Sequence, residues 1–279
     1  MKKIRLIELF GGIGCQAMAL KRTGLEFETY RYVDNDRFAV ASYNAIHGTN
    51  FEPTDITKVS GSDLGITDTD HYNYILCYSF PCTDISVAGK MAGYSREDWE
   101  NGKSTRSGLL WEVERILEET VELPQFLLME NVTQVHCKKN MTGFVRWLSY
   151  LESRGYKNYI KDMNAKDYGV AQSRNRCFML SILNGHGFSF PEPVPLQKTM
   201  RDYLEDKVDE CFYVNKDRAK ALIQKLVDEG RVPCAGGCFL KNKGETFVKN
   251  IDVAKTLMAR DYKGMGRNFS NGVVEKDVI

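Results

Sequence analysis

The chain opens with KIRLIELFGGIGCQAMALKRTG (residues 3–24), which has the pattern of a strand, a glycine turn and a helix. The apolar run before GGIG is typical of a buried strand, and the apolar spacing after it predicts a helix that ends at Gly24. A second unit of this kind comes next, with a strand in ETYRYVD (28–34) and a helix in RFAVASYNAIHG (37–48). Two consecutive strand–helix units predict a parallel sheet.

The alternation continues downstream. It predicts strands at 72–80, 125–132, 156–164 and 176–183, helices at 109–122 and 140–155, and a polar loop at 87–107. Cys82 and Glu130 are both expected just beyond the ends of strands. Because ligands of open α/β sheets bind outside the carboxyl ends of the strands, this is where we expect the site.

The pattern breaks after residue 187, where FSFPEPVPLQKT (188–199) carries three prolines. The remaining residues predict short strands and one helix at 216–230. The predicted fold is therefore α/β, Rossmann-like with a mostly parallel sheet. A catalytic and cofactor-binding domain is expected at 1–187 and a smaller mixed domain at 188–279.

Composition predicts a folded, soluble, cytoplasmic protein with no membrane segment, since 43% of residues are hydrophobic and no apolar run reaches 18 residues. The eight cysteines lack the paired spacing of a disulfide framework, so reduced thiols are expected. PCAGGC (233–238) has no second Cys/His pair nearby, and no metal site is predicted. Residues 231–279 hold nine Lys/Arg and five Asp/Glu, a charge of +4 that fits a phosphate-contacting surface or a solvated face equally.

The glycine turn by itself fits tight packing as well as nucleotide binding. Asp34 strengthens the second interpretation, because a carboxylate at the end of the second strand can accept hydrogen bonds from ribose hydroxyls. Asp55, in TDIT (54–57), is expected at the end of a third strand, within reach of an exocyclic amine. Small and hydroxyl residues flank Cys82, which favours an exposed nucleophile over a structural thiol.

Four motifs make the pattern specific. FGGIG (10–14), SFPCTDIS (79–86), MENV (129–132) and AKDYGVAQSRNRCF (165–178) occur in the order and approximate spacing of the cytosine-5 DNA methyltransferases. The chain resembles this family over residues 4–183, and ARDYKG (259–264) is similar to the target-recognition region of bacterial and phage members. The resemblance implies methyl transfer from S-adenosylmethionine to C5 of a flipped cytosine in a specific double-stranded DNA sequence.

The same resemblance assigns roles to catalytic residues. Cys82 adds to C6 of the base, Glu130 protonates or hydrogen-bonds N3, and Arg176 contacts O2. Arg174 organises the active site.

Further positions are implied by the resemblance. The cofactor is assigned Phe10, Gly12, Gly14, Asp34, Asp55, Ile56 and Leu109. The target base or DNA is assigned Pro81, Ser86, Arg106 and Asn131, of which Asn131 orients its loop. The loop Val87–Ser107 is expected to close behind the flipped base.

The chain also departs from the family pattern. Cys15 and Ala171 replace a usual glycine and proline, and neither the arginine–glutamate segment nor the final GN-containing helix is found; RNFSNGVV (267–274) matches the latter only faintly. A truncated chain, a chain completed by a second polypeptide, and an inactive relative would each explain this, and the second is favoured. The alternative functions are cytosine-5 methylation of RNA and a non-catalytic DNA-binding or regulatory subunit. The encoding genome is expected to be bacterial or phage, with nucleoid DNA as the substrate.

Overall fold

The computed structural model describes residues 2–85, 93–103, 105–185 and 187–205, and beyond them only 209, 217, 221, 238–239, 253–256 and 273–274. The chain forms two compact units, Met1–Met163 with Arg176–Phe190, and Asn164–Asn175 with Pro191–Ile279. The predicted helix at 216–230 lies outside the described residues except for 217 and 221. The loop predicted at 87–107 lies outside them over 87–92 and at 104. The domain boundary at residue 187 stays a prediction.

Among the described residues, the first unit contains a six-stranded sheet in the order β2-β1-β3-β4-β7-β5. The pairs β1–β2, β1–β3 and β3–β4 are parallel, and β4–β7 is antiparallel. The mostly parallel sheet predicted from the sequence is therefore confirmed. The strands are β1 (Lys3–Leu9), β2 (Phe27–Val33), β3 (Tyr72–Tyr78), β4 (Phe126–Asn131), β5 (Tyr156–Asn164) and β7 (Asn175–Leu183).

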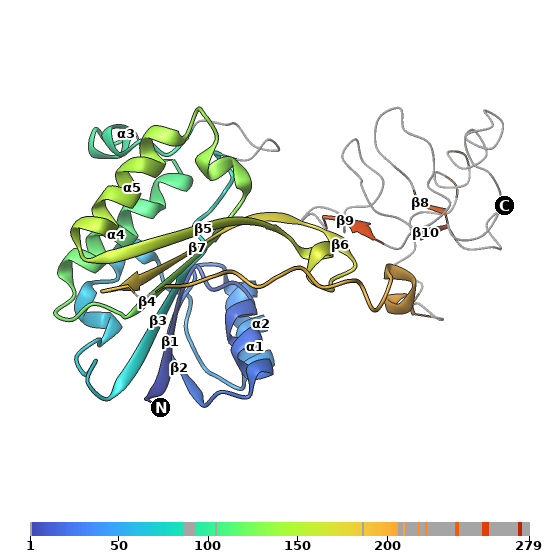
Figure 1. The fold of residues 1–279 in the computed structure, drawn as a ribbon, viewed down its shortest axis with the longest axis horizontal. Coiled ribbons are helices and arrows are strands. Elements are labelled where there is room, and N and C mark those ends of the chain that lie inside the picture. The colour runs from blue at the N-terminus through green and yellow to red at the C-terminus, as the bar shows by residue number, and fades with distance from the viewer. Residues whose placement is uncertain are drawn as a thin grey trace. The chain divides into compact units, whose positions relative to one another are not determined.

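Helices cover both faces of this sheet. Figure 1 shows α1 and α2 on one face and α3, α4 and α5 on the other. The helices are α1 (Cys15–Thr23), α2 (Arg37–His47), α3 (Arg96–Glu100), α4 (Leu110–Glu119) and α5 (Met141–Ser153). The short 3₁₀ turns of this unit are η1 (Ile56–Lys58), η2 (Gly61–Leu64), η3 (Ser107–Leu109) and η4 (Thr133–His136).

The apolar strands pack on both faces, as the strands of a parallel sheet must. Leu6 and Cys77 bury their side chains with Ala17 of α1. On the other face, a larger core surrounds Trp111 of α4 and Trp147 of α5, whose rings meet nearly at right angles. Strand β1, which pairs with β2 and β3, therefore lies between two apolar layers.

The first two helices end where the sequence predicts. Gly24 and Gly48 follow α1 and α2 with φ of 72° and 68°, a left-handed conformation that glycine adopts without strain. At the start of α2 the Asp36 side chain accepts a hydrogen bond from the Phe38 amide, a common N-terminal cap. The strands predicted at 28–34, 72–80, 125–132, 156–164 and 176–183 and the helices predicted at 109–122 and 140–155 lie within a few residues of the observed elements.

Three local predictions were wrong. Asp55 does not end a strand: it caps the 3₁₀ turn η1, because its side chain bonds the Thr57 amide and so competes with extended pairing. Glu130 lies inside β4 and not beyond it, since β7 extends the pairing to the last residues of β4. The segment 87–107 is not only a loop, because Arg96–Glu100 forms α3.

The second unit is described only in part. Its η5 (Ala165–Asp167) is followed by β6 (Gln172–Ser173), which pairs in parallel with β9 (Ala254–Lys255). A 3₁₀ turn, η6, spans Met200–Tyr203, and β8 (Cys238–Phe239) pairs with β10 (Val273–Val274). Within the portions of the chain that the structure describes, no helix has the length and apolar character needed to cross a bilayer.

Candidate active site

The turn after β1 has an unusual backbone. Phe10 and Gly12 have φ of 56° and 55°, and Gly14 has φ of 79°. A left-handed conformation is rare for a bulky residue such as Phe10 and costs on the order of 1–3 kcal/mol, so it persists only where the fold enforces it. Such enforced strain is common at ligand sites, which is where the sequence places Phe10.

The glycines of this turn have different roles. A Cβ atom on Gly14 would approach the rings of His47 and Tyr43 to within 2.4 and 2.5 Å, so this glycine permits close packing of α2 against the turn. A Cβ on Gly12 would meet nothing within 4 Å. Gly12 therefore borders open space, as a residue beside a bound cofactor would.

Hydrogen bonds join this turn to the loops after β2 and before η1. The Gly12 amide donates to Asp34 Oδ2 at 2.9 Å, and the Asp36 amide donates to Asp34 Oδ1 at 2.9 Å. The Thr54 amide donates to the Asp34 carbonyl at 2.8 Å. The structure thus joins two predicted cofactor positions, Gly12 and Asp34, and links them to Thr54, the residue before a third, Asp55.

Glu8, near the end of β1, hydrogen-bonds both helices that flank the glycine turn, and its role was not predicted from the sequence. Its side chain is 1% exposed, accepts a hydrogen bond from the Tyr43 hydroxyl at 2.6 Å, and accepts another from the Ala17 amide at 3.3 Å. Burial raises the pKa of the Glu8 carboxyl, while these two bonds act in the opposite direction. A lone acid in the apolar run LIELF was the available signal, because buried acids are rare unless they are hydrogen-bonded.

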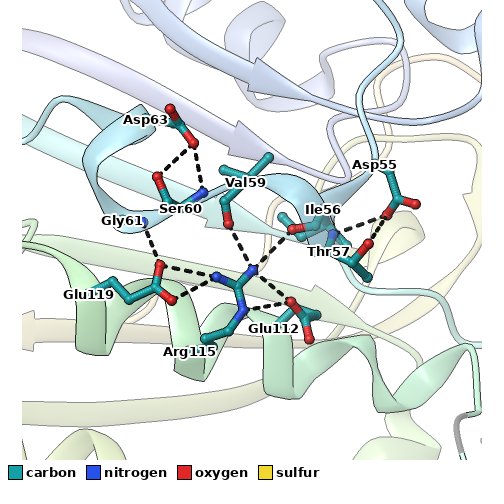
Figure 2. A network of polar contacts seen from close by, with 10 residues as sticks. All are labelled: Asp55, Ile56, Thr57, Val59, Ser60, Gly61, Asp63, Glu112, Arg115 and Glu119. Atoms are coloured by element: carbon teal, nitrogen blue, oxygen red, sulfur yellow. Dashed lines mark hydrogen bonds and ion pairs between the residues drawn. The ribbon is translucent and has the colours of Figure 1, made fainter.

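The Asp55 turn is fixed to helix α4 by one arginine (Figure 2). Arg115 donates to the carbonyls of Ile56 at 3.3 Å and Val59 at 2.8 Å, and its guanidinium also bonds Glu112 and Glu119 of its own helix. Ile56 itself is buried.

One further bond attaches this region to α4, and two others brace the turn itself. Glu119 accepts from the Gly61 amide at 2.9 Å, so the next turn is tied to the same helix. Asp55 Oδ1 accepts from both the amide and the hydroxyl of Thr57, and these bonds lower the pKa of the Asp55 carboxyl. The predicted adenine-side residues Asp55 and Ile56 are therefore on a braced turn.

The loop that carries Cys82 follows β3 and is held on both sides. The Asn131 side-chain amide donates to the Phe80 carbonyl at 3.0 Å, and Asn131 is 3% exposed. The Ser107 hydroxyl donates to the Pro81 carbonyl at 2.7 Å. Both residues before Cys82 are fixed in this way, while the Cys82 side chain remains partly exposed.

Glu130 and Arg176 form an ion pair on adjacent strands. Arg176 Nε lies 2.9 Å from Glu130 Oε1, with side chains 17% and 22% exposed. The pair arises from the antiparallel register of β4 and β7, in which Glu130 lies opposite Phe178. The sequence-predicted acid and guanidinium are thus together, and the acid directly precedes the Asn131 that holds the Cys82 loop.

The other predicted residues lie in different parts of the chain. Leu109 ends η3 and packs on the main core, and Arg106 is exposed immediately before η3. Arg174 belongs to the second unit, where its amide donates to Asn164 Oδ1 at 2.9 Å. Ser86 lies outside the described residues.

One buried atom bears on whether these residues suit a polar cofactor. Ser79 Oγ, in the residue after β3, is buried and has no hydrogen-bond partner among the described residues. The Ser79 amide donates to the Leu9 carbonyl, so this hydroxyl lies where β1 and β3 end side by side, with β2 beyond one strand and β4 beyond the other. This is the switch point at which open sheets bind nucleotides, and the orphaned hydroxyl and the open side of Gly12 fit a polar ligand there.

The open, mostly parallel sheet with a glycine turn after its first strand is a Rossmann-like arrangement, and methyltransferases are among the solved structures similar to it. Two solved structures share it. The Dnmt2 methyltransferase of S. pombe matches with a TM-score of 0.65 at 18% identity, covering 96% of this chain and 74% of that one. Entamoeba histolytica EhMeth matches with a TM-score of 0.70 at 17% identity, covering 97% and 75%.

The chain belongs to the C-5 cytosine-specific DNA methylase family, whose model matches residues 4–238. It is 32% identical over 263 residues to the type II methyltransferase M2.ScrFI of Lactococcus lactis subsp. cremoris, covering 77% of this chain and 71% of that protein. The orphan methyltransferase M.SssI of Spiroplasma monobiae is 34% identical over 268 residues, covering 77% and 68%. M.NlaX of Neisseria lactamica, also type II, is 31% identical over 265 residues, covering 93% and 76%. The family resemblance inferred from four motifs is thereby confirmed.

Proposed function

We propose that the chain methylates C5 of cytosine in a specific double-stranded DNA sequence, with S-adenosylmethionine as methyl donor and Cys82 as nucleophile. The observation that carries the proposal is the Glu130–Arg176 ion pair, which lies beside the Asn131 that holds the Cys82 loop. Family membership supports cytosine-5 methylation in general. The covalent route, the duplex substrate and the residue roles are the parts that need testing.

The proposed chemistry begins at Cys82. Its thiolate forms a bond to C6 of the cytosine, and the electron pair of the C5=C6 double bond becomes available at C5 as an enamine. Negative charge then develops toward N3 and O2 of the ring. The proposed role of Glu130 is to donate its carboxyl proton to N3 as the thiolate adds, and that of Arg176 is to hydrogen-bond O2, so that both stabilise this charge.

Completion of the reaction restores the enzyme. Bound S-adenosylmethionine supplies an electrophilic methyl group. Once C5 carries the methyl group, a base removes the C5 proton, the double bond reforms and the bond between Cys82 Sγ and C6 breaks. Glu130 takes back the N3 proton in the same phase, so no net change remains on Cys82 or Glu130.

The cofactor is proposed to lie along the switch point between β1 and β3. Phe10 and Gly12 border it there, and Gly14 allows the turn to approach α2. Asp34 is proposed to accept from the ribose, although both its oxygens already accept backbone bonds, so each would use a second lone pair. Asp55, Ile56 and Leu109 are proposed to contact the adenine side.

DNA is proposed to present its target base flipped out of the stack, because C6 is inaccessible to a thiolate within a duplex. Pro81 and Ser86 flank the nucleophile, and the exposed Arg106 is proposed to contact the phosphate backbone. The geometry favours an indirect role for Asn131, since its buried amide is engaged with Phe80. By family resemblance, Arg174 is proposed to help organise the active site.

Trapping with a modified base tests the covalent route. Duplex DNA that contains 5-fluorocytosine cannot lose fluorine from C5, so elimination stops and the adduct accumulates. We expect a cofactor-dependent species of the combined mass of protein and DNA that survives denaturing electrophoresis. Cys82→Ser should form none, whereas Cys15→Ser, a change at an exposed thiol, should form it normally. Adduct formation by Cys82→Ser would refute the assignment of the nucleophile.

The substrate is tested in a parallel assay. Incorporation of labelled methyl groups is compared among duplex DNA, single-stranded RNA and a mixture of both, and duplex DNA is expected to be the preferred acceptor. Preference for RNA would support the alternative enzyme. Binding of DNA without turnover would support the non-catalytic subunit.

The predicted second polypeptide is tested by adding neighbouring gene products, and full activity of residues 1–279 alone would contradict it.

A further inference from the structure

Three side chains that the methyl-transfer chemistry does not use converge next to the active site. His136 ends η4, Asp162 lies in β5, and Cys177 lies in β7. Each residue offers one possible ligand atom: an imidazole nitrogen, a carboxylate oxygen or a thiol sulfur. These three atoms lie within 4.8 Å of one another. We propose that these residues form a binding site for a thiophilic divalent metal ion, with Zn²⁺ the expected occupant.

The local contacts show that the three groups already face one another. His136 Nε2 lies 2.9 Å from Asp162 Oδ1, with side chains 31% and 38% exposed. The Cys177 thiol hydrogen-bonds the same carboxylate from the buried side, where Cys177 is 0% exposed. Asp162 therefore lies between a buried sulfur and a partly exposed imidazole, which leaves a route from solvent to the site.

The spacing suits a metal ion after a small contraction. Ligand atoms on a tetrahedral zinc ion lie about 3.3–3.8 Å apart, because zinc–nitrogen, zinc–oxygen and zinc–sulfur bonds are about 2.0–2.3 Å long. The three ligand atoms lie within 4.8 Å of one another, and rotation of the partly exposed His136 and Asp162 side chains can bring them to this spacing. Three protein ligands with a water in the fourth position form a common zinc arrangement.

Charge also favours an ion of this type. A divalent cation bound by one thiolate, one carboxylate and one neutral imidazole forms a group with no net charge, which can be held at the edge of the core. Magnesium and calcium are poor occupants, because both prefer ligand sets made only of oxygen. The sulfur of Cys177 and the nitrogen of His136 therefore select for zinc and similar ions.

The position of the site indicates what the ion would do. Arg176 and Cys177 are consecutive residues of β7, so their side chains point to opposite faces of the sheet. The proposed metal site and the Glu130–Arg176 pair thus lie on opposite faces of the sheet at β7. A bound ion would fasten η4, the segment after the Glu130 strand, to β5 and β7. It would stabilise the strand pairing that holds the pair together without touching the substrate.

Direct binding measurements test the proposal. The full chain, stripped with a chelator, is titrated with Zn²⁺ in competition with a chromophoric chelator, and with Co²⁺ as a spectroscopic probe. We expect one equivalent bound at His136, Asp162 and Cys177, and a near-ultraviolet thiolate-to-cobalt band. All measurements use a Cys234→Ser/Cys238→Ser background, so that the PCAGGC segment cannot contribute.

Variants of the partly exposed ligands separate binding from folding. His136→Gln and Asp162→Asn should each weaken Zn²⁺ binding by at least about 100-fold and reduce the cobalt band. Cys15→Ser, which changes an exposed thiol, should leave both unchanged. Cys177→Ser should abolish the band, and its circular dichroism must match that of the parent.

Two results would overturn the proposal. One is the absence of a thiolate band when the parent chain is titrated with Co²⁺. The other is unchanged Zn²⁺ affinity in both His136→Gln and Asp162→Asn, which would leave the three residues as a hydrogen-bonded group with a purely structural role.

Discussion

At the level of single residues, the proposed chemistry depends on the Glu130–Arg176 ion pair. A planar guanidinium holds a carboxylate in a defined orientation, which a flexible ammonium does less well. The pair lies within two strands of a sheet and not on loops, so its geometry is fixed before any substrate binds. Such preorganisation is what a site needs to stabilise charge as it develops.

Replacement of the acid tests this role. Glu130→Gln keeps the size of the side chain but removes the proton donor, so single-turnover methyl transfer should slow by about 10²–10⁴-fold. Binding of S-adenosylmethionine, measured by calorimetry, should stay within about twofold. The matched control is Glu122→Gln, which alters a carboxylate bonded to Thr69 before β4 begins. A rate for Glu130→Gln within threefold of the parent would contradict the assigned role.

The turn after β1 provides a second prediction at this scale. Gly12→Ala places a methyl group at φ of 55° in space that is otherwise open, which should lower the free energy of unfolding by about 1–2 kcal/mol. It should also raise the dissociation constant of S-adenosylmethionine by about tenfold or more, since the methyl group enters the proposed cofactor space.

Gly24→Ala is a close control. Gly24 has φ of 72° and equally open surroundings, but it ends α1 away from the turn. Its stability loss, followed by urea denaturation, should be similar, and its cofactor affinity unchanged. Equal affinities in the two variants would show that Gly12 does not border the cofactor.

Sequence alone predicted residues that lie in recognisable motifs. It missed residues that hold the turns of the proposed site in place. Cys82, Glu130 and Arg176 were assigned because each sits in a short segment typical of the family. Glu8 and Arg115 were missed because their partners, Tyr43 for one and the Ile56 and Val59 carbonyls for the other, become neighbours only in the folded chain. The proposed metal ligands were missed for the same reason, since 26 residues separate His136 from Asp162 and 15 separate Asp162 from Cys177.

Among the secondary-structure elements, α4 connects two parts of the proposed site. Its first residues follow Ser107, which holds Pro81, and its middle carries Arg115, which holds the Asp55 turn. The loop that carries Cys82 and the Asp55 turn are therefore fastened to one continuous segment, η3 followed by α4. A displacement of α4 would change both, so we expect this helix to be a positioning element for the proposed reaction.

Arg115→Met tests this connection. The change removes two bonds to the carbonyls of the Asp55 turn while keeping an apolar stem of similar length. We expect the KM for S-adenosylmethionine to rise by about five- to twentyfold with kcat within threefold, because a loosened turn weakens binding more than chemistry. Arg115→Lys should recover only part of the affinity, since one ammonium cannot span the same acceptors.

Arg5→Met distinguishes this effect from general destabilisation. Arg5 bonds Glu28 at 2.7 Å and lies over the Tyr72 ring at 3.5 Å, early in β1 and away from the carboxyl ends of the strands. The Arg5→Met substitution should lower the melting temperature of the protein without altering the KM for S-adenosylmethionine. A similar KM change in both variants would indicate that Arg115 contributes only to overall stability.

Element boundaries were predictable where local chemistry set them. Gly24 and Gly48 ended the first two helices because each takes a left-handed conformation at the helix end. The prediction of a strand ending at Asp55 was wrong, because hydrogen bonds from Thr57 to the Asp55 side chain favour a tight turn. The position of Glu130 within β4 depended on pairing with β7, which lies about fifty residues away and leaves no local signal.

For the molecule as a whole, the mostly parallel sheet and the family were both predictable from the sequence. Two strand–helix units at the start imply the parallel arrangement, and four ordered motifs imply the family that the family model confirms over residues 4–238. The place of β7 between β4 and β5 was not predictable, because long-range pairing depends on packing of the complete sheet. The target-recognition prediction for residues 259–264 falls outside the described residues apart from its neighbours at 253–256.

Overall stability should depend on pH through Glu8. Burial raises the pKa of this carboxyl in the folded chain, so on raising the pH the unfolded chain loses the proton first. The contribution of Glu8 to stability is therefore complete below the ordinary glutamate pKa and is lost as pH rises toward the raised value. Across that interval, wild type should lose up to about 1.4 kcal/mol per pH unit relative to Glu8→Gln.

Urea denaturation at several pH values measures this difference. Glu122→Gln should show the opposite trend, because hydrogen bonds from Thr69 lower the pKa of the Glu122 carboxyl and make its contribution grow as pH rises. A pH-independent difference between wild type and Glu8→Gln would mean that Glu8 ionises normally in the folded protein.

The insertion of β7 between β4 and β5 also has a consequence for synthesis on the ribosome. β5 leaves the exit tunnel before β7, yet β7 is the strand that pairs with β4. A nascent chain that ends before Asn175 therefore has a β4 edge without its final neighbour, and exposed edges of this kind pair readily with other chains. Arg176 reaches Glu130 only when β7 arrives, so the growing polypeptide acquires its charged pair at the same step that closes this edge.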